Sequence, residues 1–136
     1  MLLLAWLACS TPEAPPAPAT AGQAAPAPAP ATVRQTDAAG LKAAMDAKEV
    51  RLLLDVRSPE EYAAGHVPGA VLLPLPELQG RLAELTPNKD EAIYVICEVG
   101  GRSARASALL AAEGFQPVNV DGGTRAWREA GLPVER

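Results

Sequence analysis

The spacing of apolar residues changes repeatedly along the chain after residue 32. Short apolar runs at 50–56, 70–73, 93–97 and 118–120 are typical of buried strands in a parallel sheet. Between them, apolar residues recur every three or four positions, which predicts helices over about 37–47, 76–86 and 103–113. A short strand at 33–35 and helices after residues 58 and 121 complete the pattern. Strands and helices that alternate in this way predict an α/β fold, with a mostly parallel sheet of about five strands and helices on both faces.

Residue patterns predict the start of one of these helices and the buried face of another. Ser58 is expected to be an N-cap, followed by Pro at the first helical position and by Glu61 at the third, where its side chain can close a capping box. The helix over 103–113 is expected to bury its small residues, which would let it lie close to the sheet. These residues are Ala104, Ala108 and Ala111.

Composition divides the 136-residue chain into three parts. Residues 1–9 are an apolar segment, and residues 10–32 hold seven of the fourteen prolines and nine alanines, with Glu13 as the only charge. A segment of that composition buries too little apolar surface to fold, so it is predicted to be a disordered, semi-rigid linker. Residues 33–136 remain, enough for one small domain.

The N-terminal segment predicts a membrane anchor rather than a span. Residues 1–8 are far too short to cross a bilayer and look like the end of a secretory signal. Leu7-Ala8-Cys9 resembles the processing box of bacterial lipoproteins, which implies lipidation at Cys9 and a location on the periplasmic side of a bacterial membrane, lipid-anchored or secreted. Two features depart from that pattern, because no Lys or Arg precedes the apolar run and Trp6 stands where a smaller residue is usual. An upstream start and a chance apolar N-terminus are the alternatives.

Charge and cysteine content narrow the function classes. The net charge is −4 and no basic run exists, so nucleic acid is not an expected partner. Two cysteines do not make a disulfide framework. One histidine and one cysteine in the domain cannot close a zinc site, so no metal is expected.

The most informative chemistry follows the strand at 93–96. Cys97 comes directly after this strand, and Arg102 follows it at the start of a helix, with Gly100 and Gly101 in the connecting loop. A strand, a tight loop and a helix direct backbone N–H groups into a small bowl. Such a bowl favours the thiolate of a cysteine at its floor, so we expect a depressed pKa and a nucleophilic Cys97. Glycine at both loop positions is expected to let the backbone turn.

This loop resembles the active-site loop of rhodaneses, the sulfurtransferases. Three other stretches match in order, and the resemblance covers roughly residues 33–136. It implies a rhodanese-like fold and transfer of a sulfane sulfur through a Cys97 persulfide, with no cofactor and with residues 98–102 binding the sulfur anion. The matching stretches are Cys97-Glu-Val-Gly-Gly-Arg-Ser103, Leu54-Asp-Val-Arg-Ser-Pro-Glu-Glu-Tyr62, Gly65-His-Val-Pro-Gly-Ala70 and Val120-Asp-Gly-Gly-Thr-Arg-Ala-Trp127.

The resemblance leaves several sulfur donors and acceptors open. Thiosulfate, a polysulfide or a persulfide is the expected donor, including the persulfide of a partner protein. Cyanide, sulfite or a thiol is the expected acceptor. The loop residues expected to bind the sulfur anion are Glu98, Val99, Gly100, Gly101 and Arg102. Glu98 is the discordant residue, because a carboxylate at the loop mouth would repel a dianion such as thiosulfate by roughly 1 kcal/mol or more.

Arg57 and His66 have two interpretations each. Arg57 is expected near the same sheet edge as Cys97. In one interpretation it binds the donor or the loop. In the other, which is favoured, it pairs with Asp55 or Glu61 and fixes the short helix. His66 is the only histidine, but its Gly-His-Val-Pro-Gly-Ala setting implies a structural turn rather than a catalytic base.

Two other function classes stay open. A tethered rhodanese-like module that senses redox state or binds a partner without catalysis is the main alternative. Cysteine phosphatases of related fold use a loop that is one residue longer than the four residues between Cys97 and Arg102, which disfavours a phosphatase.

Overall fold

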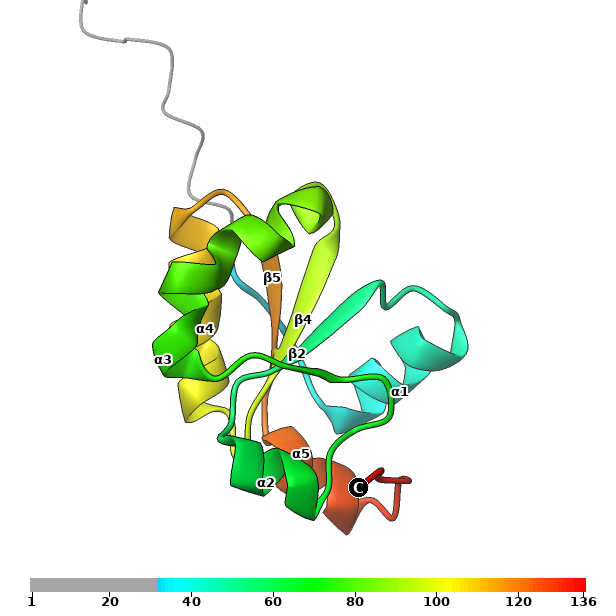
Figure 1. Cartoon of the computed structure of the whole chain (residues 1–136). Helices are drawn as coiled ribbons and strands as arrows, with labels where there is room; N and C mark the ends of the chain where they lie inside the picture. Colours follow the sequence, from blue (N-terminus) through cyan, green and yellow to red (C-terminus); the bar gives the residue numbers. More distant parts are fainter. Residues whose placement is uncertain (1–31) are drawn as a thin grey trace, which may run out of the picture.

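The computed structural model describes residues 32–136 (Figure 1). The predictions for the apolar segment, for Cys9 and for the linker concern residues 1–31, which lie outside the described residues. Five strands form one parallel sheet in the order β1-β5-β4-β2-β3. The strands are β1 (Arg34–Thr36), β2 (Leu52–Asp55), β3 (Val71–Leu72), β4 (Ala92–Ile96) and β5 (Gln116–Val120).

Helices cover both faces of this sheet, as Figure 1 shows, which confirms the predicted α/β class. Helices α3 and α4 pack on one face, whereas α1 and α5 pack together on the other. The helices are α1 (Ala38–Asp46), α2 (Pro59–Ala64), α3 (Leu75–Leu78), the 3₁₀ helix η1 (Gln79–Asn88), α4 (Gly101–Ala112) and α5 (Gly123–Glu129).

The central strands are buried on both sides because successive residues point to opposite faces. Leu54 and Val95 pack in the core beneath α3 and α4, whereas Leu53 and Ile96 pack beneath α1 and α5. This arrangement explains the continuous apolar runs of β2 and β4. Cys97 follows β4 at the centre of the sheet, at the carboxyl edge where ligands of such folds bind.

The predicted capping box is present. Ser58 Oγ accepts a hydrogen bond from the backbone N–H of Glu61, and the Glu61 carboxylate accepts one from the backbone N–H of Ser58. At the start of α1, the Asp37 side chain accepts from Gly40 N at 2.7 Å.

Two expectations about helices were wrong. Ala104 and Ala108 are exposed, and only Ala111 of the three is buried. Helix α4 begins at Gly101, and its buried stripe is Ser103, Ala106, Ser107, Leu110 and Ala111. The helix expected over 76–86 is α-helical only to Leu78 and continues as η1, which contains Gly80 and Pro87, two residues that disfavour an α-helix.

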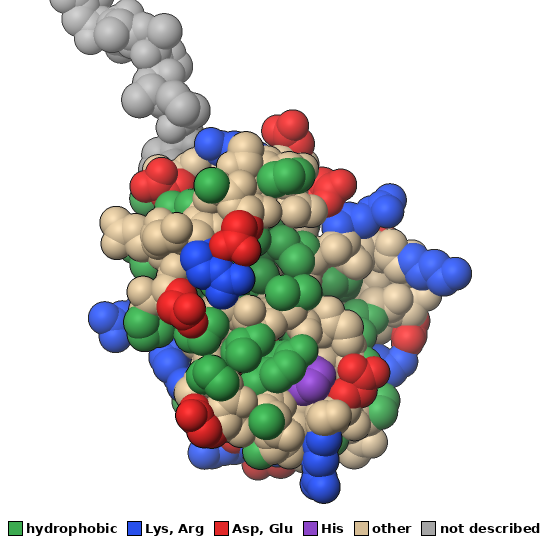
Figure 2. All heavy atoms as spheres, viewed as in Figure 1, with side chains coloured by type: hydrophobic (Ala, Val, Ile, Leu, Met, Phe, Trp, Pro, Cys, Tyr) green, Lys and Arg blue, Asp and Glu red, His purple; other side chains and the backbone are tan. Residues whose placement is uncertain are grey.

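The described residues offer neither a membrane span nor a metal cluster. Between residues 32 and 136, no helix is long and apolar enough to cross a bilayer. In the same range, no three His, Cys, Asp or Glu side chains are grouped to hold a metal ion. Acidic and basic side chains are interspersed on the face that Figure 2 shows, so this face carries no extended basic surface.

Candidate active site

The N-terminus of α5 holds the start of the Cys97 loop. The carbonyl oxygen of Cys97 accepts from the backbone N–H of Thr124 at 2.8 Å and from its hydroxyl at 3.1 Å. The next carbonyl, of Glu98, accepts from Arg125 N at 3.0 Å. Gly123 makes this contact feasible, because a Cβ at that position would lie 2.3 Å from the Cys97 carbonyl oxygen. Both carbonyls therefore point toward α5.

The opposite side of the loop surrounds the cysteine with hydrogen-bonding groups. Gly100 N donates to Cys97 Sγ at 3.0 Å, the thiol donates to Ser103 Oγ at 3.4 Å, and the Ser103 hydroxyl donates to the Gly100 carbonyl oxygen at 3.1 Å. Gly100 has a φ of +111°, a conformation that favours glycine. Gly101 has no positive φ and a Cβ there would meet open space, so the expectation that both glycines serve the turn holds only for Gly100.

These hydrogen bonds change the acidity of the thiol. Cys97 is 1% exposed, and burial by itself raises the pKa of a thiol. Hydrogen bonds with the Ser103 side chain and from the backbone N–H groups of Ser103, Gly100 and Val99 outweigh burial, so the pKa of Cys97 lies below its ordinary value. The predicted thiolate-stabilising bowl is therefore present.

Arg102 is held by a partner that the sequence did not indicate. Its Nη1 and Nη2 atoms donate to the two carboxylate oxygens of Glu61 at 2.7 and 2.8 Å. This hydrogen bond is the main cause that raises the pKa of Arg102; burial opposes it, and attraction to Cys97 adds to it. The guanidinium is thus held in place by Glu61 of α2.

Glu98 does not face the loop mouth as an unpaired carboxylate, which corrects the expectation about its charge. Its Oε2 atom lies 3.3 Å from Arg57 Nη1, and its Oε1 atom accepts a hydrogen bond from Arg128. The predicted repulsion of thiosulfate considered Glu98 alone. Arg57 and Arg128 together with Glu98 and Asp55 form a connected group of two cations and two anions, so the charge of Glu98 is balanced within it.

The Arg57 side chain is buried and its hydrogen bonds are to groups within the protein. It is 2% exposed; its Nη2 atom donates to Asp55 at 2.7 Å and to the carbonyl of Gly65 at 2.8 Å, and its Nε atom also bonds Asp55. The pairing with Asp55 is confirmed, whereas the pairing with Glu61 is not, because Glu61 binds Arg102. These contacts favour the structural role of Arg57 over binding of a donor. Its contact with Glu98 also bears out the expectation that Arg57 holds the loop.

His66 also has structural partners. Its Nδ1 atom lies 2.9 Å from the Tyr62 carbonyl, and its ring stacks on the Tyr62 ring with centroids 3.7 Å apart. Its backbone pairs with Glu135. The interpretation of His66 as part of a structural turn agrees with these contacts.

Val99 contributes its backbone to the site. Val99 is 50% exposed, and its backbone N–H contributes to the lowered pKa of Cys97. Sequence reasoning missed Ser103, Glu61 and Thr124 as site residues. Each belongs to a stretch that signalled the site, but their contacts join elements far apart in the chain.

Comparison with known proteins finds one matching family model and several similar proteins. The family model described as rhodanese-like domain matches residues 37–130. A sulfurtransferase of Allochromatium vinosum is 37% identical over 103 residues, which cover 75% of this chain and 94% of that protein. The thiosulfate sulfurtransferase PspE of Escherichia coli is 38% identical over 72 residues, 53% of this chain and 69% of the relative.

A solved structure shares the fold. The rhodanese-related protein of Thermoplasma volcanium aligns with a TM-score of 0.69 and 35% identity, over 75% of this chain and 97% of that one. Other relatives are longer, and the chain spans 46% of one and 37% of another. The family model's match lies within the folded domain that carries Cys97.

Proposed function

Because the chain belongs to the rhodanese-like domain family, we propose that it is a sulfurtransferase in which Cys97 carries the sulfane sulfur as a persulfide. One observation carries the proposal: a buried thiol accepts from the Gly100 backbone N–H and is hydrogen-bonded to Ser103, and these hydrogen bonds lower the pKa of Cys97. The relatives named sulfurtransferases support the same class of reaction.

Loading begins with the Cys97 thiolate. It attacks the outer sulfur of a donor such as thiosulfate, the S–S bond of the donor breaks, and sulfite leaves with the electron pair. The product is a Cys97 persulfide anion. The N–H groups that face Sγ are placed to stabilise negative charge on sulfur, as donors preorganised around a developing anion do.

In the second step, the Cys97 persulfide transfers its outer sulfur to an acceptor. A nucleophile such as cyanide, sulfite or a thiol attacks the outer sulfur, the bond from that sulfur to Sγ breaks, and Cys97 leaves as the thiolate. No external oxidant or reductant is needed, because one neutral sulfur atom moves between two nucleophiles.

The direct test is Cys97→Ser. This variant should lose transfer from thiosulfate to cyanide completely while it keeps the fold, as judged by its unfolding curve. Transfer retained by a folded Cys97→Ser protein would contradict the mechanism.

The proposed location is the periplasmic side of a bacterial membrane, through lipid on Cys9. The apolar run that precedes Cys9 and the Pro- and Ala-rich segment that follows it support this proposal.

A further inference from the structure

Thr124 is a buried residue of α5 that holds the Cys97 loop through both its backbone and its side chain. Its N–H donates to the Cys97 carbonyl oxygen at 2.8 Å, and its hydroxyl donates to the same oxygen at 3.1 Å. A carbonyl oxygen has two lone pairs, so both bonds can form at once. Two bonds from one residue fix the direction of this carbonyl more narrowly than a single bond would.

The start of α5 is built around these loop carbonyls. Its N-cap is Gly122, which has no side chain to cap the helix. The Cys97 and Glu98 carbonyls bond the N–H groups of Thr124 and Arg125 instead, which are among the first-turn donors that have no partner within a helix. The loop therefore depends on α5 for its position, and α5 depends on the loop for its cap.

The direction of the carbonyls decides where the loop N–H groups point. In a planar trans peptide the N–H points away from the preceding carbonyl oxygen, and residues 32–136 contain no cis peptide bond. Since the Glu98 carbonyl points toward α5, the N–H of Val99 points to the opposite side, toward the thiol. Burial raises the pKa of Cys97, whereas hydrogen bonds with Ser103 and from the Gly100 and Val99 N–H groups lower it.

The Thr124 hydroxyl can be removed with little change in side-chain shape. Thr124→Val keeps the backbone N–H bond and places a methyl group where the hydroxyl stands. A methyl carbon does not fit 3.1 Å from a carbonyl oxygen, because close contacts between carbon and oxygen lie at about 3.3–3.6 Å. The substitution therefore removes one hydrogen bond and displaces the Cys97 carbonyl.

We propose that Thr124 is a positioning residue for sulfur transfer, whose hydroxyl fixes the Cys97 carbonyl so that the loop N–H groups face the sulfur. The inference rests on the proposed function. Thr124 acts through the backbone of Cys97, because its hydroxyl bonds the carbonyl and not Sγ. The same alignment of N–H groups serves the thiolate before loading and Sγ of the persulfide after it.

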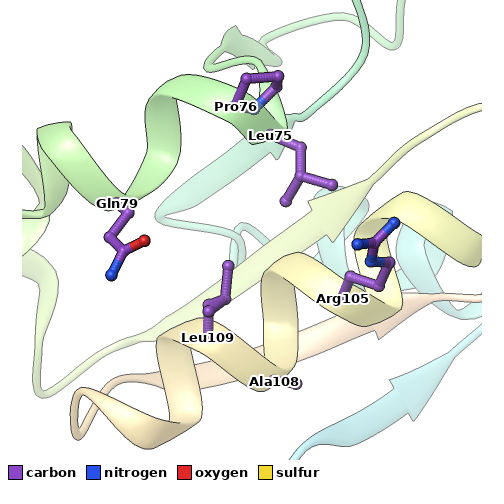
Figure 3. A pocket seen from close by; sticks show the side chains of 6 residues that line it. All are labelled: Leu75, Pro76, Gln79, Arg105, Ala108 and Leu109. Carbon is purple, nitrogen blue, oxygen red and sulfur yellow. The ribbon is translucent and has the colours of Figure 1, made fainter.

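Ser107 offers a matched control, since it is another fully buried hydroxyl. It lies on the inner face of α4, and within residues 32–136 its Oγ atom has no hydrogen-bond partner. The outer face of the same helix is a separate surface, where Figure 3 shows Arg105 and Leu109 lining a hollow opposite Leu75. Ser107→Ala thus removes a hydroxyl from the core without breaking a hydrogen bond to the loop.

The test uses the full chain and follows the peptide that contains Cys97 by mass. Alkylation of Cys97 is measured against pH, and sulfur loading from thiosulfate is measured against time at pH 7. Misplacing a reacting group by about 1 Å costs on the order of a hundredfold in rate. Thr124→Val retains one of the two bonds, so it should slow loading by on the order of tenfold and move the alkylation midpoint to higher pH.

Two comparisons separate positioning from packing. Thr124→Ser keeps the hydroxyl and should restore both the loading rate and the midpoint, whereas Ser107→Ala should change neither. Arg102, the charged group attracted to Cys97, is the same in all of these variants. If urea unfolding shows that Thr124→Val does not fold, Thr124→Ala is compared with Thr124→Ser in the same way.

Three outcomes would overturn or redirect the inference. A folded Thr124→Val protein with an unchanged midpoint and loading rate would show that the hydroxyl serves the fold alone. A change that Thr124→Ser does not restore, or that Ser107→Ala reproduces, would assign the effect to core packing. Failure of the unmodified chain to load any sulfur would instead refute the proposed function, while the alkylation midpoint would still test whether Thr124 positions the thiol.

Discussion

The ion pair between Glu61 and Arg102 is expected to stabilise the fold above pH 4.5 and to lose that effect in acid. The hydrogen bond to Arg102 is the main cause that lowers the pKa of Glu61 from 4.5 to about 2; burial opposes it, and the Ser58 backbone adds to it. Because the folded-state pKa is the lower one, the stabilisation is complete above about 4.5 and disappears as the pH falls toward 2.

The size of the effect follows from the shift. At 1.36 kcal/mol per pKa unit, the full shift corresponds to about 3 kcal/mol of folding free energy. The Glu61 side chain is 34% exposed and Arg102 is 39% exposed, so solvent screens part of the interaction. About 1–2 kcal/mol is therefore expected to remain.

Glu61→Gln tests this estimate. Glutamine keeps an oxygen for the Ser58 N–H but loses the charge, so urea unfolding at pH 7 should show a loss of about 1–2 kcal/mol that shrinks between pH 5 and pH 3. Glu84→Gln is the control, because Glu84 binds Arg81 in a similar but more exposed pair, and it should leave stability unchanged. A Glu61→Gln protein as stable as the unmodified one at pH 7 would refute the reasoning.

Three further predictions concern the loop and the N-terminus. Ser103→Ala should raise the pKa of Cys97, so the midpoint of thiol alkylation against pH should move upward; an unchanged midpoint would show that the backbone N–H groups suffice. Arg102→Ala should slow transfer from thiosulfate by on the order of tenfold to a thousandfold, as loss of one anion-stabilising donor does, and an undiminished rate would assign Arg102 to structure alone. Cys9→Ala should move the protein out of the membrane fraction, and its continued retention there would defeat the lipoprotein interpretation.

The features that sequence predicted well depend on neighbouring residues. The Ser58 cap, the buried runs of β2 and β4 and the place of Cys97 after a central strand each follow from a few consecutive positions. The predicted buried face of α4 was wrong, because the residues that face the sheet depend on where the helix begins. The structure begins the helix at Gly101, which turns Ala104 and Ala108 to the surface.

The features that sequence missed join distant segments. Glu61 and Arg102 are 41 residues apart, Cys97 and Thr124 are 27 apart, and Glu98 and Arg128 are 30 apart. These contacts depend on how the sheet order brings α2 and α5 to the loop. Glu61 had a sufficient local role as part of the capping box, which gave no reason to look for a second partner.

The central claim is that Cys97 accepts a sulfane sulfur, and intact mass measures this directly. After exposure to thiosulfate or a polysulfide and removal of the excess, the protein should gain the mass of one sulfur atom, and cyanide should remove it. Cys97→Ser should gain nothing under the same treatment. A folded protein with a free Cys97 thiol that gains no sulfur from any of these donors would contradict the account and favour a rhodanese-like module without catalytic activity.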